Sequence, residues 1–417
     1  MELSRFGEKF TSESGILALM DDLGRALAGS DKKYMLGGGN PAHIPAVNAV
    51  WRRQMQQVLD TPEALERMLA NYDPPQGNAA FIEALARLLQ RQLGWKVGPE
   101  NIAITNGSQM SFFLLFNMFA GPMPDGSRRK ILFPLMPEYI GYADQTIEAG
   151  MFTARRPLIE EIDSHSFKYH VDIAATEIES DIGALCVSRP TNPTGNVLTD
   201  DELAHLDRIA QQAGVPLIVD NAYGVPFPGM IFEEATPLWN ENTIVAMSLS
   251  KIGLPATRSG ILVAAPQVIS AVSACNAVVS LANGSIGQTL VAPLLDSDEI
   301  MHMAREIIRP FYQQKSQQAQ RWIGEEFGSD IDYSVHRSEG SLFLWLWLRD
   351  LPISTMELYQ RLKKRNTIVV PGRYFFFGLA QPWEHQDQCI RLNYAMDDAD
   401  VRRGIALIAD EVRRVRV

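Results

Sequence analysis

The sequence predicts an α/β protein with a large domain built on a mainly parallel sheet and a smaller α+β domain. Three observations carry this prediction. The chain has 417 residues, which exceeds the size at which a single hydrophobic core stops growing. Its middle alternates short apolar runs with helical patterns, which is typical of parallel strands joined by helices. Its last part changes to a long helical pattern followed by mixed strands and helices.

Short apolar runs mark the strands expected in the large domain. Each run is apolar throughout rather than alternating, because strands of such a sheet are covered by helices on both faces. Right-handed crossovers through the intervening helices place these strands parallel to one another. The runs are residues 101–105, 130–133, 184–187, 216–219, 243–247 and 260–264.

The clearest connecting helix begins after Thr199. Thr199 and Glu202 match the capping-box pattern, in which each side chain accepts a hydrogen bond from the other residue's backbone N–H. Leu203 and Leu206 then recur on one helical face, and Gly214 predicts the end of the helix.

The later part of the chain predicts the smaller domain. A helical pattern covers residues 296–327, with a kink expected at Pro310. Two strand patterns then flank a further helix, at residues 341–347, 367–370 and 355–365. We expect residues 47–307 to form the large domain, and residues 1–46 with 308–417 the small domain. No Gly/Ser-rich linker separates them, so we expect the domains to pack together.

Composition excludes several classes of partner. The formal charge is −11 and no basic block occurs, which argues against nucleic acid and against an anionic membrane. No apolar run approaches the roughly 18–20 residues that span a bilayer, and the charged first nine residues do not resemble a signal peptide. We therefore expect a cytoplasmic protein.

The potential metal ligands are scattered along the chain. Cys186, Cys275 and Cys389 are far apart and lie in apolar contexts, which predicts buried free thiols in a reducing compartment. The closest histidines, His165 and His170, are five residues apart and do not share a helical face. We expect no metal site.

The most informative motif follows the strand at 243–247. Lys251 lies just past it, preceded by Ser248 and Ser250 and followed by Arg258. A desolvated lysine beside another cation has a lowered pKa and can condense with an aldehyde. The hydroxyls and the guanidinium suit a phosphate. Taken alone, Lys251 could equally be a solvated residue at a strand end.

Residues after other strands supply what an aldehyde cofactor with a phosphate and a ring would need. Asn106–Gly107 leads into a helix that begins near Ser108 and Gln109, and a helix N-terminus favours an anion. Many ordinary strand–helix turns also contain glycine. Tyr139, in the turn after 130–133, could stack on a planar ring, although core packing is the commoner role of tyrosine.

Two further strand ends carry polar groups. Asn192 lies in a loop made rigid by two prolines and could donate to an oxygen. Asp220 follows the strand at 216–219, with Tyr223 close behind. An aspartate there can hold a pyridine nitrogen protonated, which turns the ring into an electron sink, although capping a helix is an equally ordinary role. A nicotinamide fingerprint is excluded, because the glycine-rich stretch at 36–41 has the wrong spacing.

With these motifs, the chain resembles the fold-type I aminotransferases, which use pyridoxal 5′-phosphate. The resemblance runs from the segment at 6–10 through 36–41, 105–109, 137–144, 187–196, 220–229 and 248–258 to Asn393–Tyr394. Within that family the chain is similar to a bacterial branch that exchanges amino groups between small neutral amino acids and pyruvate.

The resemblance implies a role for each matched residue. Lys251 would bond to the cofactor and then carry the proton between the substrate Cα and the cofactor. Asp220 would pair with the pyridine nitrogen, and Tyr223 and Asn192 with the phenolic oxygen. Tyr139 would stack on the ring. The phosphate would be bound by Ser108, Gln109, Ser248 and Arg258, with Tyr72 reaching in from the second subunit of a homodimer.

The resemblance also implies the substrate site. Arg391 would clamp the substrate carboxylate through a bidentate pair, assisted by the Gly39 backbone and Asn192. The interval from Lys251 to Arg258 is seven residues. It is one residue shorter than in much of the family, which shortens this loop.

The charges near the motif predict the substrate class. Aminotransferases that take aspartate or glutamate need a second cation for the side-chain carboxylate. No Lys or Arg occurs between Arg258 and Arg305, residues 278–285 are small and neutral, and position 109 is glutamine. We expect ping-pong transfer among small neutral amino acids (valine, alanine, 2-aminobutyrate) and 2-oxo acids such as pyruvate and 2-oxoisovalerate.

Three other functions stay open on the residues alone. A β-lyase on the same fold would use the same cofactor motifs. An aromatic or kynurenine-type aminotransferase would differ in side-chain preference. A ligand-binding transcription regulator is the remote alternative, since such proteins carry a helix-turn-helix module ahead of this fold and only a short segment precedes Leu36.

Overall fold

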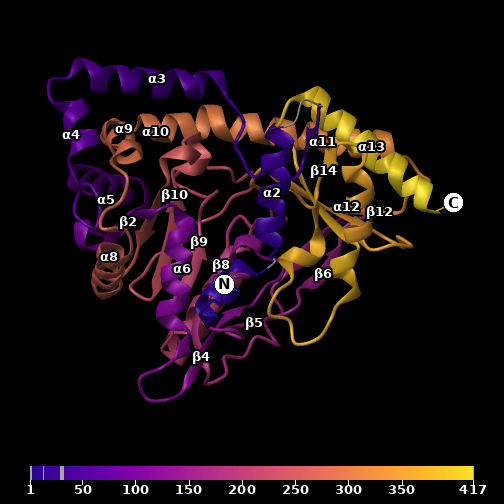
Figure 1. Ribbon diagram of the computed structural model, residues 1–417, viewed down its shortest axis with the longest axis horizontal. Helices are drawn as coiled ribbons and strands as arrows, with labels where there is room; N and C mark the ends of the chain where they lie inside the picture. The colour runs from indigo at the N-terminus through magenta and orange to yellow at the C-terminus, as the bar shows by residue number, and fades with distance from the viewer. Residues whose placement is uncertain (1, 13, 29–31, 417) are drawn as a thin grey trace.

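Two large β-sheets, a two-stranded sheet of β1 (Tyr34–Met35) and β14 (Thr367–Ile368), and the helices packed against them make up the described part of the protein (Figure 1). The computed structural model describes residues 2–12, 14–28 and 32–416. The helices α3 to α9 gather around the first sheet, and α11, α12 and α13 around the second (Figure 1). The α/β prediction is confirmed.

The first sheet has eight strands in the order β2-β11-β10-β9-β8-β4-β3, with β5 paired to β4. The neighbours β10, β9, β8, β4 and β5 run parallel, whereas β11 is antiparallel to both β10 and β2. All the apolar runs of the sequence are strands here. The bounds are β2 Ile102–Asn106, β3 Gly121–Pro122, β4 Arg128–Phe133, β5 Phe152–Ala154, β8 Ile182–Ser188, β9 Leu217–Asp220, β10 Thr243–Ser248 and β11 Ser259–Val263.

The second sheet has six strands in the order β15-β16-β13-β12-β7-β6. The hairpin of β6 and β7 lies inside the range expected for the large domain, yet β7 pairs in parallel with β12. The second sheet therefore contains strands from both of the expected domains. The domain boundaries themselves stay a prediction. The bounds are β6 Leu158–Glu161, β7 Ser166–His170, β12 Tyr333–His336, β13 Phe343–Leu348, β15 Val370–Pro371 and β16 Cys389–Asn393.

The capping prediction for α7 (Asp200–Ala213) is confirmed. Thr199 Oγ1 accepts from the Glu202 N–H at 3.1 Å, and Glu202 Oε2 accepts from the Thr199 N–H at 2.8 Å. The helix ends at Gly214, whose φ of +68° favours glycine. The other helices around the first sheet are α3 Pro45–Asp60, α4 Ala64–Ala70, α5 Ala79–Leu93, α6 Ser108–Phe119, α8 Pro266–Ser280 and α9 Ser285–Asp296.

The long helical segment contains a π-helical stretch rather than a simple kink. It starts with α10 (Glu299–His302), continues through π-helical Met303–Ile308 and becomes α11 (Arg309–Phe327). The irregularity lies just ahead of Pro310, which has no N–H to donate to the carbonyl four residues earlier. The remaining helices are α12 (Thr355–Lys363) and α13 (Asp398–Arg416).

Successive strand residues enter two separate hydrophobic clusters, one on each face of the first sheet. In β10, Val245 and Met247 join one cluster, while Ile244 and Ala246 join the other. This alternation explains why the strands are apolar throughout. Within the described residues, no helix has the length and apolar character to cross a membrane, and no cluster of His, Cys, Asp and Glu suits a metal ion.

Candidate active site

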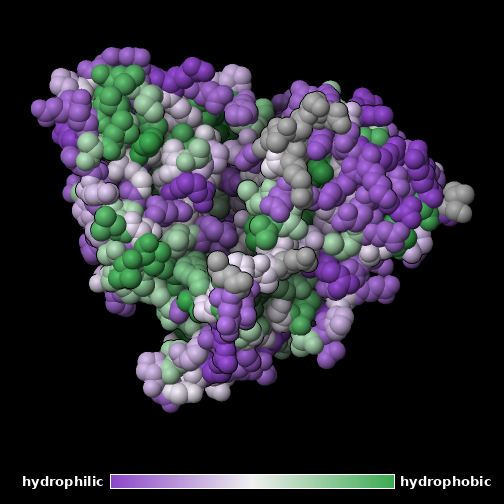
Figure 2. All heavy atoms as spheres, viewed as in Figure 1, coloured by the Kyte–Doolittle hydropathy of each residue, from purple (hydrophilic) through white to green (hydrophobic). Residues whose placement is uncertain are grey.

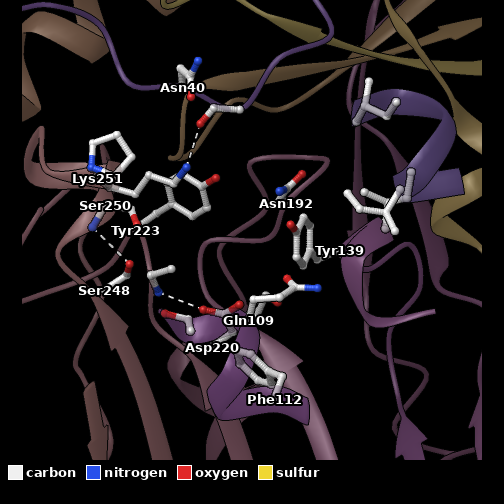
Figure 3. Close-up of a pocket in the computed structure, with 18 of the residues that line it drawn as sticks. Asn40, Gln109, Phe112, Tyr139, Asn192, Asp220, Tyr223, Ser248, Ser250 and Lys251 are labelled. Atoms are coloured by element: carbon white, nitrogen blue, oxygen red, sulfur yellow. Dashed lines mark hydrogen bonds between the residues drawn. The ribbon is translucent and has the colours of Figure 1, made fainter. Parts of the chain in front are cut away.

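A cavity of about 430 Å³ lies at the carboxyl ends of β8, β9 and β10 (Figure 3). Open α/β sheets bind ligands at this edge, because the loops that follow the strands converge there. All the predicted site residues except Tyr72 line this cavity. They are Gly39, Ser108, Gln109, Tyr139, Asn192, Asp220, Tyr223, Ser248, Lys251, Arg258 and Arg391.

Lys251 enters the cavity from the short 3₁₀ turn that follows β10. Its Nζ donates to the Gly39 carbonyl oxygen at 2.7 Å and lies 5.2 Å from the centre of the Tyr223 ring (Figure 3). Burial, helped by the charges of Arg391 and Arg258, lowers the pKa of Lys251 to about 8, against the attraction of Asp220. A substantial fraction of the amine is therefore neutral near physiological pH, as a nucleophile requires.

Asp220 ends β9 and presents a carboxylate to the same cavity. Its Oδ1 accepts from the Ala222 N–H at 2.9 Å, and its Oδ2 accepts from the Tyr142 hydroxyl. Burial raises the pKa of Asp220, while these two hydrogen bonds and the charge of Lys251 oppose the rise. Capping a helix is not its role, because residues 221–230 contain no helix.

The cavity has room for a flat ring between these groups. Figure 3 shows Tyr139 and Asn192 across the cavity from Lys251, with Asp220 and Gln109 below them. The ring of Tyr139 lies against Gly141, where a Cβ would come within 2.3 Å of Cε1. Glycine at that position thus makes room for the tyrosine side chain.

The start of α6 and the Arg258 side chain form an anion cradle. The guanidinium lies directly over Gly107, where a Cβ would come within 2.2 Å of Nη2. Gly107 also has a φ of +82°, so glycine is required for two reasons. Ser108 and Ser248 add hydroxyls, and the free N–H groups of the helix start favour a negative charge.

Arg391 lies in the middle of β16 and is 2% exposed. Its Nη1 donates to Asn192 Oδ1 and its Nη2 to the Gly37 carbonyl oxygen, both at 2.7 Å. The guanidinium also lies 4.0 Å from the centre of the Phe343 ring. Burial lowers the pKa of Arg391 to about 10, so the group is still cationic at neutral pH. Both hydrogen bonds go to neutral oxygens, and a buried cation of this kind favours an anionic ligand.

Sequence reasoning missed the wall of the cavity formed by α2 (Gly15–Ala28). Ile16, Leu19 and Met20 of this helix line the cavity, together with Ile140 and Phe112. The signal was present in the sequence, because apolar residues recur along 15–28 at helical spacing. Which surface that helix covers is a long-range property that no local motif marks.

Contacts to both parts of the protein hold this N-terminal segment. In α1 (Arg5–Thr11), Lys9 Nζ donates to the Asp144 carbonyl oxygen at 3.2 Å. In α2, both carboxylate oxygens of Asp22 accept from Lys363 Nζ on α12 at 2.8 Å. The segment formed by α1 and α2 thus has an anchor on either side of the cavity.

Tyr72 lies outside this cavity. It follows α4 and is 83% exposed. The segment at 278–285, which entered the substrate argument, also lies outside it, with Val278 87% exposed. The cysteine prediction is confirmed in part: all three thiols are free, but Cys275 is half-buried rather than buried.

A fold of this kind, with a lysine, an aspartate and an anion cradle at one sheet edge, is typical of transferases that act on amino groups. The chain belongs to the class I and II aminotransferase family, whose model matches residues 33–408. Aminotransferases of this family and fold use pyridoxal 5′-phosphate.

Particular relatives cover nearly the whole chain. A valine–pyruvate aminotransferase of Escherichia coli K12 is 47% identical over 99% of both chains. The crystal structure of valine-pyruvate aminotransferase AvtA from Salmonella typhimurium LT2 is 47% identical, with a TM-score of 0.89 over 96% of this chain and 99% of that one. Aspartate aminotransferase of Thermus thermophilus shares the fold at 20% identity, with a TM-score of 0.79 over 99% of this chain and 100% of that one.

The residues of the cavity fit pyridoxal 5′-phosphate. The cradle at Gly107, Ser108 and Arg258 suits the phosphate, and Asp220 offers an acceptor for the pyridine nitrogen. Lys251 supplies the amine that an aldehyde needs, and Tyr139 a face for the ring.

Proposed function

We propose that the protein is a pyridoxal 5′-phosphate-dependent aminotransferase that exchanges amino groups between small neutral amino acids and 2-oxo acids by a ping-pong cycle. Valine, alanine and 2-aminobutyrate are the amino acids, and pyruvate and 2-oxoisovalerate the 2-oxo acids. The observation that carries this proposal is the apolar α2 wall, which faces a cavity whose lining cations are Lys251, Arg258 and Arg391. The valine–pyruvate aminotransferase at 47% identity supports valine and pyruvate among these substrates.

Each lining cation has a role in this proposal. Arg258 belongs to the phosphate cradle and Arg391 to the substrate carboxylate, while Lys251 carries out proton transfer. Among the described residues that line the cavity, no further Lys or Arg is left for a side-chain carboxylate. Aspartate and glutamate would therefore place a second negative charge against Ile16, Leu19 and Met20, which costs several kcal/mol without a partner.

Bound pyridoxal 5′-phosphate supplies a carbonyl for the amino group and a protonated ring that takes up electron density. The protein's own groups do the rest. Arg391 and Asn192 hold the substrate carboxylate, which fixes the direction of the substrate Cα–H bond. Lys251 Nζ takes the Cα proton, and its lowered pKa suits it to act as a base near neutral pH. Asp220 holds the proton on the pyridine nitrogen.

The competing functions differ from the proposed one in the space that they need or in the reaction that they catalyse. An aromatic or kynurenine-type enzyme needs room for a ring beyond the substrate Cβ, where Leu19 and Met20 lie. A β-lyase would eliminate a substituent instead of returning an amino group to pyruvate. A ligand-binding regulator would show no turnover.

We also propose that the protein is a homodimer with shared active sites. Tyr72 is exposed, and large apolar side chains near the same face of the first sheet are exposed with it. Figure 2 shows hydrophobic surface over α3–α4 and over α8. The apolar residues are Leu59, Leu69, Val278, Val279, Leu281 and Ile286. A second copy seated there would bury this surface and bring Tyr72 toward the phosphate cradle of its neighbour.

A cytoplasmic location is part of the same proposal. The free thiols of Cys186, Cys275 and Cys389 support a reducing compartment.

An absorption spectrum of the purified holoenzyme tests the proposed activity. L-valine should abolish the absorption band of the bound cofactor, and pyruvate should then restore it, because each reports one half of the cycle. L-aspartate should leave the band nearly unchanged, as should L-kynurenine. A band that responds to aspartate faster than to valine contradicts the substrate class. Release of ammonia, without recovery of the absorption band when pyruvate is added, indicates a lyase.

A further inference from the structure

Glu138 is a fully buried carboxyl group directly behind the active site. It precedes Tyr139 in the turn after β4 and is 1% exposed. Its Oε1 accepts from the Ser188 N–H at 2.8 Å, and its Oε2 lies 2.5 Å from Ser188 Oγ. Its own N–H donates to the Phe375 carbonyl oxygen at 3.0 Å. All these partners are neutral, which is unusual for a buried glutamate.

The charge that acts on Glu138 is that of Asp220. Ser188 and Asp220 face each other as Cα partners on β8 and β9, so the group held by Ser188 lies beside Asp220. Burial raises the pKa of Glu138 to about 8, and the charge of Asp220 adds to the rise, while the Ser188 hydrogen bonds oppose it. The other titratable groups facing Glu138 are Tyr142 and Cys186.

The surroundings of the two neighbouring carboxyl groups differ in how strongly they favour the ionised form. Asp220 has donors in the Tyr142 hydroxyl and the Ala222 N–H, and it has a nearby cation in Lys251, all of which favour its ionised form. Glu138 has only neutral donors, namely the hydroxyl and N–H of Ser188 and the backbone N–H of Tyr139, and no nearby cation among the described residues opposes its burial. A pair of acids in such unequal surroundings keeps its negative charge on one member and its proton on the other.

We propose that Glu138 is a positioning residue that carries a proton beside Asp220. It ties the turn bearing Tyr139 to the end of β8, and so fixes the loop that leads from Ser188 to Asn192. It stays uncharged there, so the negative charge behind the ring belongs to Asp220. The inference rests on the proposed cofactor site and not on the proposed substrates.

The test uses the holoenzyme and its Glu138→Gln and Glu138→Ala variants. Gln keeps the length of the side chain and hydrogen-bonding capacity without an ionisable proton, whereas Ala removes the tie to Ser188. The matched control is Glu202→Gln. Glu202 is also a buried glutamate that accepts from a hydroxyl and from backbone N–H groups, but it caps α7.

Infrared spectroscopy detects the protonated carboxyl group directly. At pH about 6.5 the wild-type holoenzyme should show the C=O stretch of a protonated carboxyl, which fades as the pH rises to about 9.5. Glu138→Gln should lose this band and Glu202→Gln should keep it. A band that persists in Glu138→Gln, or is absent from the wild type at the lower pH, overturns the assignment of the proton.

The absorbance of the bound cofactor reports how the ionisation of Glu138 affects the active site. In the wild type its pH titration should deviate from a one-proton curve near pH 8, as Glu138 ionises. Glu138→Gln should follow a simple curve and keep the wild-type KM for valine within about twofold, and Glu138→Ala should raise that KM roughly tenfold through misplacement of Asn192. Identical titration curves for wild type and Glu138→Gln contradict the inference. The infrared measurement and the pH titration use no amino acid, whereas the KM comparison does, so failure of the proposed substrates is seen separately from failure of this inference.

Discussion

Arg391 of the second sheet donates from Nη1 to Oδ1 of Asn192, in the loop that follows β8 of the first sheet, at 2.7 Å. This hydrogen bond joins β16 to the loop after β8 across the cavity. A substrate carboxylate bound at Arg391, as proposed, would contact both halves of the protein, and we expect its binding to be coupled to their closure.

Replacing Arg391 by Lys should raise the KM for valine by about 10- to 100-fold. A lysine keeps the charge but loses the planar fork, and a hydrogen bond to a charged group contributes roughly 1.5–3 kcal/mol. Steady-state kinetics with valine and pyruvate give this value, and the absorption spectrum of the bound cofactor should not change. Wild-type kinetics in Arg391→Lys would show that the carboxylate binds elsewhere.

Covalent attachment of the cofactor should depend on pH through Lys251. Burial lowers the pKa of this amine to about 8, so the reactive neutral form is the minor one below that pH. The rate at which cofactor-free enzyme combines with pyridoxal 5′-phosphate should fall about tenfold per pH unit below pH 8 and level off above it. Stopped-flow absorbance measures this rate. Lys251→Ala should fold normally, transfer no amino group, and gain no cofactor mass after borohydride reduction.

Shortening Leu19 should relax the limit on side-chain size. Leu19→Ala removes apolar volume from the α2 wall, so the ratio of kcat/KM for leucine over valine should rise about tenfold, since one methylene is worth roughly 1–3 kcal/mol. Leu17→Ala is the matched control, because Leu17 lies on the same helix, is 46% exposed and does not line the cavity. An unchanged ratio in Leu19→Ala, with circular dichroism showing a folded enzyme, would remove α2 from the substrate site.

Acid should destabilise the protein through two buried histidines. Burial lowers the pKa of His336 and of His385 to about 3, against an ordinary value near 6.5. Below pH about 6.5 the unfolded chain binds protons that the folded protein does not. Stability is therefore full above that pH and is lost as the pH falls toward 3.

The size of this acid effect can be measured by urea unfolding. Each histidine should contribute roughly 1.5 kcal/mol to the loss of unfolding free energy between pH 6.5 and 5. His336→Gln should lose one such contribution and show a smaller pH dependence. An equal pH dependence in the variant and the wild type would exclude His336 as a source.

Much of the site could be predicted from the sequence because its residues follow strands. Asp220 comes directly after an apolar run and Lys251 lies four residues past one, and parallel strands bring their carboxyl ends to one edge. Their positions depend on local pattern and on a general rule of sheet topology. Arg391 lies on another sheet, and the resemblance to a family indicated it, whereas the pattern of residues did not.

The residues that were missed depend on contacts between distant segments. Leu19 faces the cavity because the segment of α1 and α2 is anchored at one end by the bond from Lys9 to Asp144 and at the other by Lys363, and nothing at residues 15–28 indicates that path. Glu138 reads as an ordinary surface residue of a turn, and its burial follows from packing against Ser188 and Phe375. Tyr72 stays a prediction, since its role needs a second copy of the chain.

The hairpin of β6 and β7 makes the second sheet discontinuous along the chain, and this limits how the protein can be divided. A fragment that begins at residue 308 would leave β12 without the neighbour provided by Ser166 and Phe167. The exposed edge would favour aggregation over folding. A chimaera that exchanges the C-terminal part between related enzymes therefore has to exchange residues 158–170 as well, as two pieces of one graft.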